Sequence, residues 1–343
     1  MNALLIPIYE PSDRVLPFLK TFKKEDFDAF LVVDDGSGEK YRQIFDEIAK
    51  ETPFCVVSHD KNLGKGQALK TGISYLMEHY EDLEFIVTAD GDGQHLRKDI
   101  LRIKKKALEH PGQLVIGARD FSKAPPKSAS GNIWSARFFR FATGMKVSDC
   151  QTGLRALPKE SFSLALETYG NRFEYEMNFL MKAARPFEVE EAKITTVYEE
   201  NNKGTHFRPV MDSFRIMGEP IAYLLVALIS FGIDILAFAL LSYFSVWGNP
   251  LWPCLIARAI SLPVNYVLLM KSAFHQKGVL RASLWKYLLV AIFSFVTQYG
   301  ISLGLAGLWG STIWARILVG FLVGVITYFI HLNVTFAPSK RRK

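Results

Sequence analysis

The sequence predicts an α/β unit with a mostly parallel sheet, followed by an all-α membrane domain of four transmembrane helices. Two patterns support this fold class. Toward the N-terminus, short β-rich runs alternate with helical patterns, which is typical of parallel strands joined by helices that cover both faces of a sheet. Toward the C-terminus, several apolar segments each reach about 20 residues, which is long enough to cross the hydrocarbon of a bilayer.

The elements of the α/β unit follow from hydrophobic periodicity. We expect strands at 3–8, 30–34, 54–58, 84–89, 113–117 and 189–198, and amphipathic helices at 40–50, 65–79 and 98–109. Ligands of such sheets bind at the carboxyl ends of the strands, so the polar turns that follow the strand candidates are the first place to look for a site.

Four apolar segments are expected to span the membrane, at about 221–244, 251–270, 287–308 and 313–332. The joints 245–250 and 309–312 carry no charge, whereas 271–286 holds four basic residues and the tail 339–343 is basic. The positive-inside rule therefore predicts that the α/β unit and both termini are cytoplasmic. The first residues form a strand-like run without a basic leader, so we expect no signal peptide.

The two predicted helix pairs resemble each other. Tyr266 and Phe274 near the end of the second span recur as Tyr328 and Phe336 near the end of the fourth, at the same offset along the chain in both cases. This repetition suggests a duplicated two-helix unit, although aromatic residues are enriched at membrane interfaces in any case.

Composition excludes some classes of function. From Ile221 onward the chain holds 10 Lys and Arg against one acid, Asp234, which leaves 31 basic and 33 acidic residues before it. The α/β unit is thus nearly neutral, which argues against a nucleic-acid binder. The three cysteines are scattered without metal-ligand spacing, as expected for reduced, buried or incidental thiols in a protein that faces the cytosol.

The most informative motif is Asp90-Gly91-Asp92-Gly93-Gln94, which follows the apolar run 85–87. Its two carboxylates and amide suit Mg²⁺ or Mn²⁺ bound against a diphosphate. Asp34 and Asp35 are expected at the same edge of the sheet, where repulsion among four carboxylates favours a cation. The structural alternatives without a metal are a solvated turn for the motif at 90–94 and a helix cap for Asp35-Gly36-Ser37.

Two other phosphate sites are excluded by spacing. Gly36-Ser37-Gly38 lacks the third glycine of a dinucleotide fingerprint, and 62–68 lacks the Lys-Ser/Thr pair of a P-loop.

Several motifs together resemble family 2 inverting glycosyltransferases with the GT-A fold, in particular the branch that glycosylates polyprenyl phosphates. They are Pro7-Ile8-Tyr9-Glu10, Val33-Asp34-Asp35-Gly36-Ser37, Asn62-Leu63-Gly64-Lys65-Gly66, Asp90 to His95, Ser148 to Arg155, Thr205 to Arg208 and Ser213-Phe214-Arg215. The apolar region is similar to the GtrA family through Arg258 to Tyr266 and Phe274. The resemblance implies a glycosyltransferase domain at 1–215, a membrane domain at 216–338 and a basic tail at 339–343.

The resemblance also implies roles for single residues. Asp90, Asp92 and Gln94 would hold the metal, and Pro7, Tyr9, Glu10, Asp35, Lys65 and Asp90 would bind the nucleotide. Asp149 and Arg155 would join Asp92 as catalytic residues near the sugar and the acceptor phosphate. For Glu10, a solvated residue before Pro11 is an equal alternative. Where related enzymes tend to place an arginine after the last buried strand, this chain has Lys127, which leaves the acceptor-phosphate ligand open.

A lipid acceptor requires a site at the bilayer. Residues 131–145 mix aromatic side chains with Arg137, which suits an interfacial helix, although an amphipathic helix packed on the sheet has the same pattern. His206, Arg208 and Arg215 precede the first span and suit a lipid phosphate or a plain basic anchor. Three charges fall inside predicted spans: Asp234, Arg258 and Arg316. Asp234 and Arg258 suit a buried ion pair, and Arg316 suits snorkelling to the outer surface. Alternatively, Arg258 and Arg316 suit a site for a translocated sugar phosphate headgroup.

The sequence thus leads to one main hypothesis, transfer of a monosaccharide from a nucleotide sugar, by default UDP-glucose, to a polyprenyl phosphate on the cytoplasmic face. A processive polysaccharide synthase is disfavoured because the Gln-x-x-Arg-Trp signature is missing from the sequence. A lipid-linked sugar transporter whose N-terminal domain only binds nucleotide sugar remains the alternative.

Overall fold

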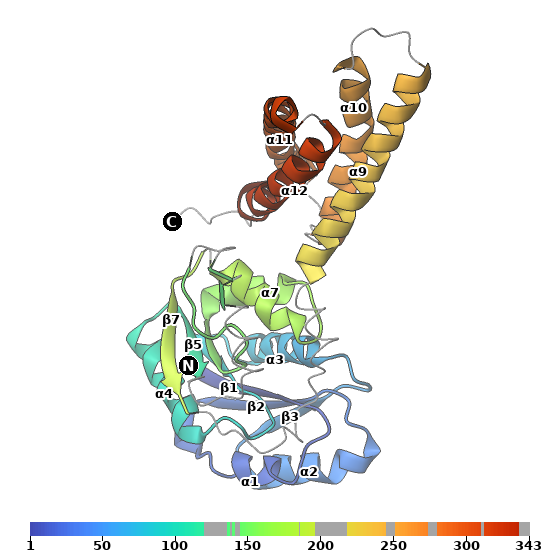
Figure 1. Ribbon diagram of the computed structural model, residues 1–343. Helices are drawn as coiled ribbons and strands as arrows, with labels where there is room; N and C mark the ends of the chain where they lie inside the picture. Colours follow the sequence, from blue (N-terminus) through green and yellow to red (C-terminus); the bar gives the residue numbers. More distant parts are fainter. Residues whose placement is uncertain are drawn as a thin grey trace. The chain divides into compact units, whose positions relative to one another are not determined.

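The computed structural model describes residues 1–119, 136–137, 139–140, 145–184, 186–195, 218–244, 251–273, 280–309 and 312–335. The chain divides into two units, Met1–Ile216 and Met217–Ser339, and each is described by itself. The first is the α/β unit and the second is the helical unit (Figure 1).

One seven-stranded sheet forms the centre of the α/β unit, in the order β3-β2-β1-β4-β6-β5-β7. Its strands are β1 (Asn2–Ile8), β2 (Ala29–Asp34), β3 (Cys55–Ser58), β4 (Phe85–Thr88), β5 (Leu114–Arg119), β6 (Arg155–Pro158) and β7 (Val189–Ile194). Among these described strands, only β6 runs antiparallel to its neighbours, so the predicted mostly parallel sheet is confirmed. The sequence did not predict β6, because a four-residue strand that begins with arginine carries no periodic signal.

Helices cover both faces of the sheet (Figure 1). One face packs against α1 (Val15–Leu19), α2 (Arg42–Glu51) and α4 (Arg97–Glu109), and the other carries α3 (Lys65–His79), with α6 (Phe162–Glu167) and α7 (Glu174–Ala183) against α3. Buried aromatic side chains fill the first layer, where Phe30 lies 5.1 Å from Phe54 between ring centroids, edge to face. This packing fixes the strand ends that carry the site.

The parallel strands end at one edge of the sheet. Ile8 pairs with Asp34 and Leu5 pairs with Thr88, so the residues that follow β1, β2 and β4 leave the sheet side by side. This register brings the turns after these three strands to one edge, as the sequence predicted.

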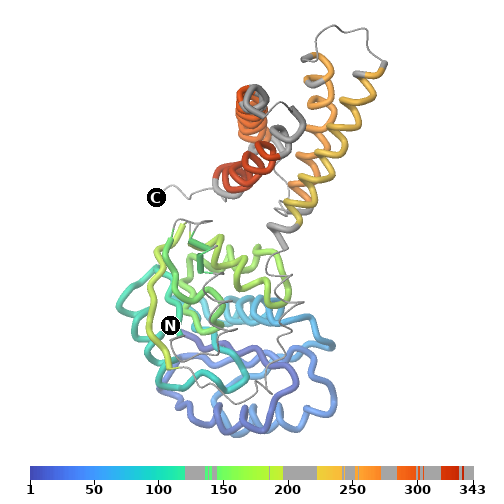
Figure 2. The backbone as a smooth tube through the Cα atoms, in the orientation of Figure 1, coloured from blue at the N-terminus to red at the C-terminus, as the bar shows by residue number. Residues whose placement is uncertain are grey.

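The helical unit contains α9 (Gly218–Phe244), α10 (Leu251–Leu268), α11 (Leu280–Trp309) and α12 (Thr312–Ile330). α9 packs against α10, and α11 against α12, as two helix pairs (Figure 2). The helix α11 begins at Leu280, before the predicted span at 287–308, and so includes the basic residues Arg281 and Lys286. In the described part of the chain, one segment, Ala222–Leu241, is long and apolar enough to cross a membrane by itself.

The predicted duplication has a structural counterpart. The first helices of the two pairs, α9 and α11, begin at Gly218 and Leu280. The second helices, α10 and α12, each continue into a π-helical segment, and these segments begin at Leu269 and His331. The offset along the chain is the same for the helix starts, for the π-helical segments and for the aromatic residues noted in the sequence. This agreement supports a repeated two-helix unit.

Candidate active site

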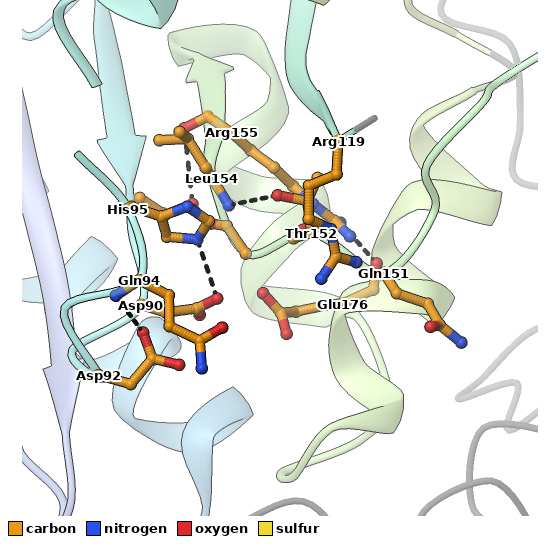
Figure 3. A network of polar contacts seen from close by, with 12 residues as sticks. Asp90, Asp92, Gln94, His95, Arg119, Gln151, Thr152, Leu154, Arg155 and Glu176 are labelled. Atoms are coloured by element: carbon orange, nitrogen blue, oxygen red, sulfur yellow. Dashed lines mark hydrogen bonds and ion pairs between the residues drawn. The ribbon is translucent and has the colours of Figure 1, made fainter. Parts of the chain in front are cut away.

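Asp90 is the centre of a charged network at the carboxyl end of β4 (Figure 3). Lys65 Nζ donates to its Oδ1 at 2.5 Å, and His95 Nε2 lies 3.0 Å from its Oδ2. Burial opposes ionisation of this carboxyl, but the charge of Lys65 and the His95 contact outweigh burial and hold the pKa of Asp90 well below its usual range. Asp90 is therefore ionised at neutral pH.

The Lys65 ammonium also bonds a second carboxylate. Lys65 is the first residue of α3, and its Nζ donates to Glu176 Oε2 at 2.7 Å. Figure 3 shows the Glu176 carboxylate pointing from α7 toward Asp90 and Gln94. Burial lowers the pKa of Lys65, but the two carboxylates raise it above its ordinary value. Sequence reasoning missed Glu176 and His95. Glu176 lies far along the chain from Lys65 without any motif around it, whereas His95 directly follows the acidic motif.

Asp92 and Gln94 lie on the loop after β4, where Asp92 Oδ1 accepts the Gln94 N–H at 3.0 Å. Burial, and then the charge of Asp90, raise the pKa of Asp92 above its ordinary value. A second positive charge at this loop would relieve that repulsion. No three His, Cys, Asp or Glu side chains in the described residues are grouped to hold a metal. Two carboxylates completed by substrate phosphates suffice for Mg²⁺, so Asp90 and Asp92 fit such an ion.

Gly153 leaves room for the Asp90 carboxylate. A Cβ at Gly153 would lie 2.1 Å from Asp90 Oδ1, far inside van der Waals contact. Its carbonyl accepts the Thr88 hydroxyl at 2.8 Å, which ties the 150–154 segment to β4. Glycine at this position is required by the close approach of two chain segments.

The expected nucleotide residues fall into two groups. Tyr9 and Glu10 are half-buried directly after β1, and Glu10 adopts a φ of +48°, a left-handed conformation that is uncommon outside glycine and asparagine. Its N–H donates to Ser37 Oγ at 2.9 Å. Burial and then the Glu10 carboxylate raise the pKa of Tyr9. Pro7 is buried within β1, opposite Val33.

Asp35 is buried and bonded on both oxygens. It accepts the N–H groups of Leu63 at 3.0 Å and Gly64 at 2.8 Å, and His59 Nδ1 lies 2.9 Å from its Oδ1. A Cβ at Gly36 would lie 2.1 Å from the Lys61 carbonyl carbon, so the two loops are in close contact. Asp35 therefore fixes the loop that leads into Lys65. Its direct contact with the nucleotide stays a prediction.

Asp149 is fully buried and forms a bidentate ion pair with Arg119. Arg119 Nε donates to Oδ2 at 2.6 Å and Nη2 donates to Oδ1 at 3.1 Å. Arg119 ends β5 at the same edge of the sheet and keeps a quarter of its side chain exposed. The sequence assigned the active role to Asp149 and overlooked Arg119. Its place two residues after the strand candidate 113–117 was the signal.

Arg155 is 2% exposed, and its guanidinium donates to three main-chain carbonyls. These belong to Thr152 at 2.9 Å, Glu176 at 2.7 Å and Cys150 at 3.0 Å. Since its donors are used inside the fold, Arg155 shapes the 150–154 loop and attaches it to α7. The expected role of Arg155 near the acceptor phosphate stays a prediction.

Most residues expected at the acceptor side lie outside the described residues: Lys127, His206, Arg208 and Arg215. Arg137 is helical and exposed, and Phe139, two positions later, is fully buried. The burial of Phe139 indicates that this side chain packs against other parts of the protein and not against lipid.

The charges of the helical unit are partly paired. Arg258 Nε lies 3.8 Å from Asp234 Oδ1, and Arg258 Nη2 donates to Gln298 Oε1 at 3.3 Å. Ser261 Oγ donates to Asp234 at 3.1 Å. The predicted ion pair is thus present in the structure, with both side chains half-buried. Arg316 lies in α12, and its side chain is outside the described part.

Comparison with known proteins identifies two families in the chain. Residues 3–163 match the family described as glycosyl transferase family 2, and residues 222–336 match the GtrA/DPMS transmembrane domain. The first match contains β1 to β6 with the whole acidic network except Glu176, and the second covers nearly all of the helical unit, including both π-helical segments.

Relatives support the same assignment. An uncharacterized protein of Methanocaldococcus jannaschii is 30% identical over 62% of this chain and 88% of its own length. A UDP-N-acetylglucosamine–dolichyl-phosphate N-acetylglucosaminyltransferase of Methanococcus voltae is 27% identical over 62% of this chain and 92% of its own length. A dolichyl-phosphate beta-glucosyltransferase of Trichomonas vaginalis is 25% identical over 46% of this chain and 53% of its own length. With its GT-A sheet and its helical unit, the chain is a membrane protein that belongs to glycosyl transferase family 2 and carries a GtrA/DPMS transmembrane domain.

Proposed function

We propose that the protein transfers a monosaccharide from a nucleoside diphosphate sugar to the phosphate of a polyprenyl phosphate, with inversion at the anomeric carbon. The observation that carries this proposal is the Asp90–Asp92 loop at the edge of the sheet in a chain that also holds a transmembrane domain. The dolichyl-phosphate acceptors named for two relatives support the same class of acceptor. UDP-glucose is the default donor.

In this reaction a phosphate oxygen of the acceptor attacks the anomeric carbon as the bond to the diphosphate breaks. The electron pair of that bond leaves with the nucleoside diphosphate. A phosphate monoester has a second pKa of about 6, so the nucleophile is already ionised at neutral pH. A general base is therefore unnecessary. The pairing of Asp149 with Arg119 is compatible with this mechanism, because no carboxylate has to accept a proton.

The donor side would be formed by the strand ends. Asp90 and Asp92, with Gln94 beside them, would hold Mg²⁺ or Mn²⁺, which neutralises charge that develops on the leaving diphosphate. Tyr9 and Glu10 would contact the base and ribose, while Pro7 and Asp35 shape their surroundings. Lys65 supplies a positive charge next to Asp90.

On the acceptor side, the guanidinium group of Arg119 suits a phosphate. Asp149 fixes its direction through two hydrogen bonds, and a quarter of its side chain remains exposed. Lys127, Arg137, His206, Arg208 and Arg215 remain expected contributors to the phosphate and lipid contacts.

The membrane arrangement completes the proposal. We assign 1–215 to the transferase, with an interfacial helix at about 131–145, 216–338 to four transmembrane helices and 339–343 to a basic tail. The termini and the transferase face the cytoplasm, as the basic residues between the second and third spans indicate. The membrane domain then serves either to anchor the enzyme or, with Arg258 and Arg316, to help move the product outward.

The test uses the full-length protein purified in detergent, with polyprenyl phosphate and a panel of radiolabelled nucleotide sugars. We expect one donor to label the lipid, and labelling to stop in EDTA and return with Mn²⁺. Asp92→Asn should reduce turnover by about 100-fold or more, since charge stabilisation of the leaving group is lost. Asp46→Asn, an exposed site on α2, is the matched control.

Two outcomes would contradict the proposal. If Asp92→Asn turned over like the wild type, the metal site would be assigned to the wrong residues. If calorimetry showed nucleotide-sugar binding but no donor labelled any polyprenyl phosphate, the alternative of a lipid-linked sugar transporter with a binding domain would be favoured.

A further inference from the structure

Lys65 places one ammonium group between two carboxylates that come from distant parts of the chain. Its Nζ lies 2.5 Å from Asp90 Oδ1 and 2.7 Å from Glu176 Oε2. The three side chains are largely enclosed, with exposed fractions of 19% for Lys65, 26% for Asp90 and 10% for Glu176. In this state the lysine supplies the positive charge that these two carboxylates require.

The fold holds the main chain before Lys65 and the position of Glu176, whereas the Lys65 side chain has rotatable bonds. The main chain before Lys65 is fixed because Asp35 accepts the N–H groups of Leu63 and Gly64. Glu176 is fixed by its position in α7, where its carbonyl accepts an N–H from Arg155. A change of charge at Asp90 would therefore be answered by rotation of the Lys65 side chain, whose four methylene groups allow it.

A divalent cation at Asp90 conflicts with this bridge. His95 Nε2 contacts Asp90 Oδ2, and Lys65 Nζ donates a hydrogen bond to Oδ1. A metal ion bound at Oδ1 would therefore lie beside an ammonium group in an enclosed site. Like charges in such a site repel strongly. A donor diphosphate brings negative charge that could accept the displaced ammonium, and this would remove the conflict.

We propose that Lys65 is an exchangeable internal cation, which neutralises Asp90 and Glu176 in the free enzyme and turns to the donor diphosphate when a divalent cation binds Asp90. This inference rests on the proposed function, because it takes the metal site from it. It follows that the metal ion binds weakly without nucleotide and that metal and nucleotide strengthen each other's binding, by the same factor in both directions.

The test measures Mn²⁺ binding to full-length protein in detergent by electron paramagnetic resonance of the free ion, without nucleotide and with UDP or GDP as probe. For the wild type we expect weak binding that nucleotide strengthens by roughly 10-fold or more. Lys65→Met should bind Mn²⁺ without nucleotide about 10-fold more tightly than the wild type, and nucleotide should add less. Lys65→Arg keeps the charge and should retain weak nucleotide-free binding.

Lys61→Met is the matched control, because it removes one charge from a nearby exposed site that precedes Lys65 in the same loop. If Lys61→Met bound Mn²⁺ as tightly as Lys65→Met, general electrostatics would explain the gain and the exchange would be wrong. If Lys65→Met had an unchanged melting temperature and bound nucleotide-free Mn²⁺ no better than the wild type, the exchange alone would be overturned. A wild type that bound no Mn²⁺ with either nucleotide would overturn the proposed metal site, and the exchange with it.

Discussion

Buried carboxylates at the sheet edge differ in how much of their hydrogen-bonding capacity the protein itself uses. Asp35 and Asp149 are bonded through both oxygens by groups of the fold, and Asp90 by Lys65 and His95. Asp92 accepts a main-chain N–H of its own loop. Asp35 and Asp149 therefore position other groups, whereas Asp92, whose pKa is raised by burial and then by the charge of Asp90, is the residue where an added cation gains most.

Gly153 tests whether the exact place of Asp90 matters. Gly153→Ala should displace the Asp90 carboxylate, because the added Cβ would lie 2.1 Å from Oδ1. We expect kcat/KM for sugar transfer to fall by about 100-fold, as is typical for a misplacement of about 1 Å. Gly304→Ala, in α11 with open space around the position, is the control and should keep wild-type turnover. Normal kinetics in Gly153→Ala would show that Asp90 needs no such clearance.

Asp26 makes stability depend on pH. Arg97 donates to it from Nε at 2.8 Å and Nη2 at 2.5 Å. Burial opposes ionisation, but the Arg97 hydrogen bonds outweigh it and lower the pKa of Asp26. A folded-state pKa below the unfolded value adds stability above the unfolded pKa, which is about 4, and loses it as pH falls through the folded value.

We therefore expect Asp26→Asn to lower the free energy of unfolding by about 2 kcal/mol at pH 7. The difference from the wild type should begin to shrink below about pH 4, where the carboxylate of the unfolded chain takes up its proton, and it should vanish once pH falls below the folded-state pKa. Thermal melts of the detergent-solubilised protein at pH 7 and pH 3.5 measure both values, with Asp46→Asn as the exposed control. A difference that grew toward acid pH would contradict the assigned sign.

At the scale of elements, periodic segments were predictable and contact-dependent ones were not. The parallel strands and α2 to α4 lie within a few residues of the predicted ranges, because burial on one or both faces produces a periodic pattern of apolar residues in the sequence. β6 and α7 depend on their neighbours in space, since β6 is a short antiparallel insertion between β4 and β5. The residues of the site divide in the same way. Lys65, Asp90 and Asp92 belong to local sequence motifs and were predictable. The pairing of Lys65 with Glu176 and the pairing of Asp149 with Arg119 depend on tertiary packing.

The two helix pairs of the helical unit differ at one corresponding position. Gly320 corresponds to Arg258 at the offset that relates the two pairs, and a Cβ at Gly320 would lie 2.9 Å from Gln298 Nε2. Gln298 in turn accepts the hydrogen bond from Arg258. Glycine in the second copy thus makes room for the amide that receives the arginine of the first copy, so this contact joins α10 to α11.

A double-mutant cycle tests whether Asp234 and Arg258 act as a structural pair. Each single change, Asp234→Asn or Arg258→Gln, leaves one charge uncompensated and should lower the melting temperature in detergent. The double variant should be more stable than the sum of the single losses predicts, with a coupling of about 1–3 kcal/mol. The same cycle at the exposed pair Lys105 and Glu109 should give about 0.5 kcal/mol or less. Additive losses at Asp234 and Arg258 would favour separate roles for the two charges.

At the scale of the whole molecule, the distribution of charge and apolar surface predicts the membrane topology. Apolar side chains are largely exposed on α9, α10, α11 and α12, with Leu236 62%, Ile260 50%, Ile292 61% and Phe321 63% exposed, as lipid-facing residues are. The basic residues gather between the second and third spans and at the tail, while the segment 245–250 carries no charge. We therefore predict four spans with cytoplasmic termini, an arrangement that would satisfy both patterns.

Reporter fusions distinguish four spans from one. Alkaline phosphatase fused after Asn249 should be active, because one crossing precedes this point, whereas fusions after Gly278 and Lys343 should be inactive, because two and four crossings precede them. We expect activity at Asn249 to exceed the other two by roughly 10-fold, and green fluorescent protein at Lys343 to be fluorescent. If Ala222–Leu241 were the sole span, fusions after Gly278 and Lys343 would both be active. The fusion after Gly278 therefore distinguishes the two topologies, because an inactive phosphatase at this point requires that 251–270 crosses back through the bilayer.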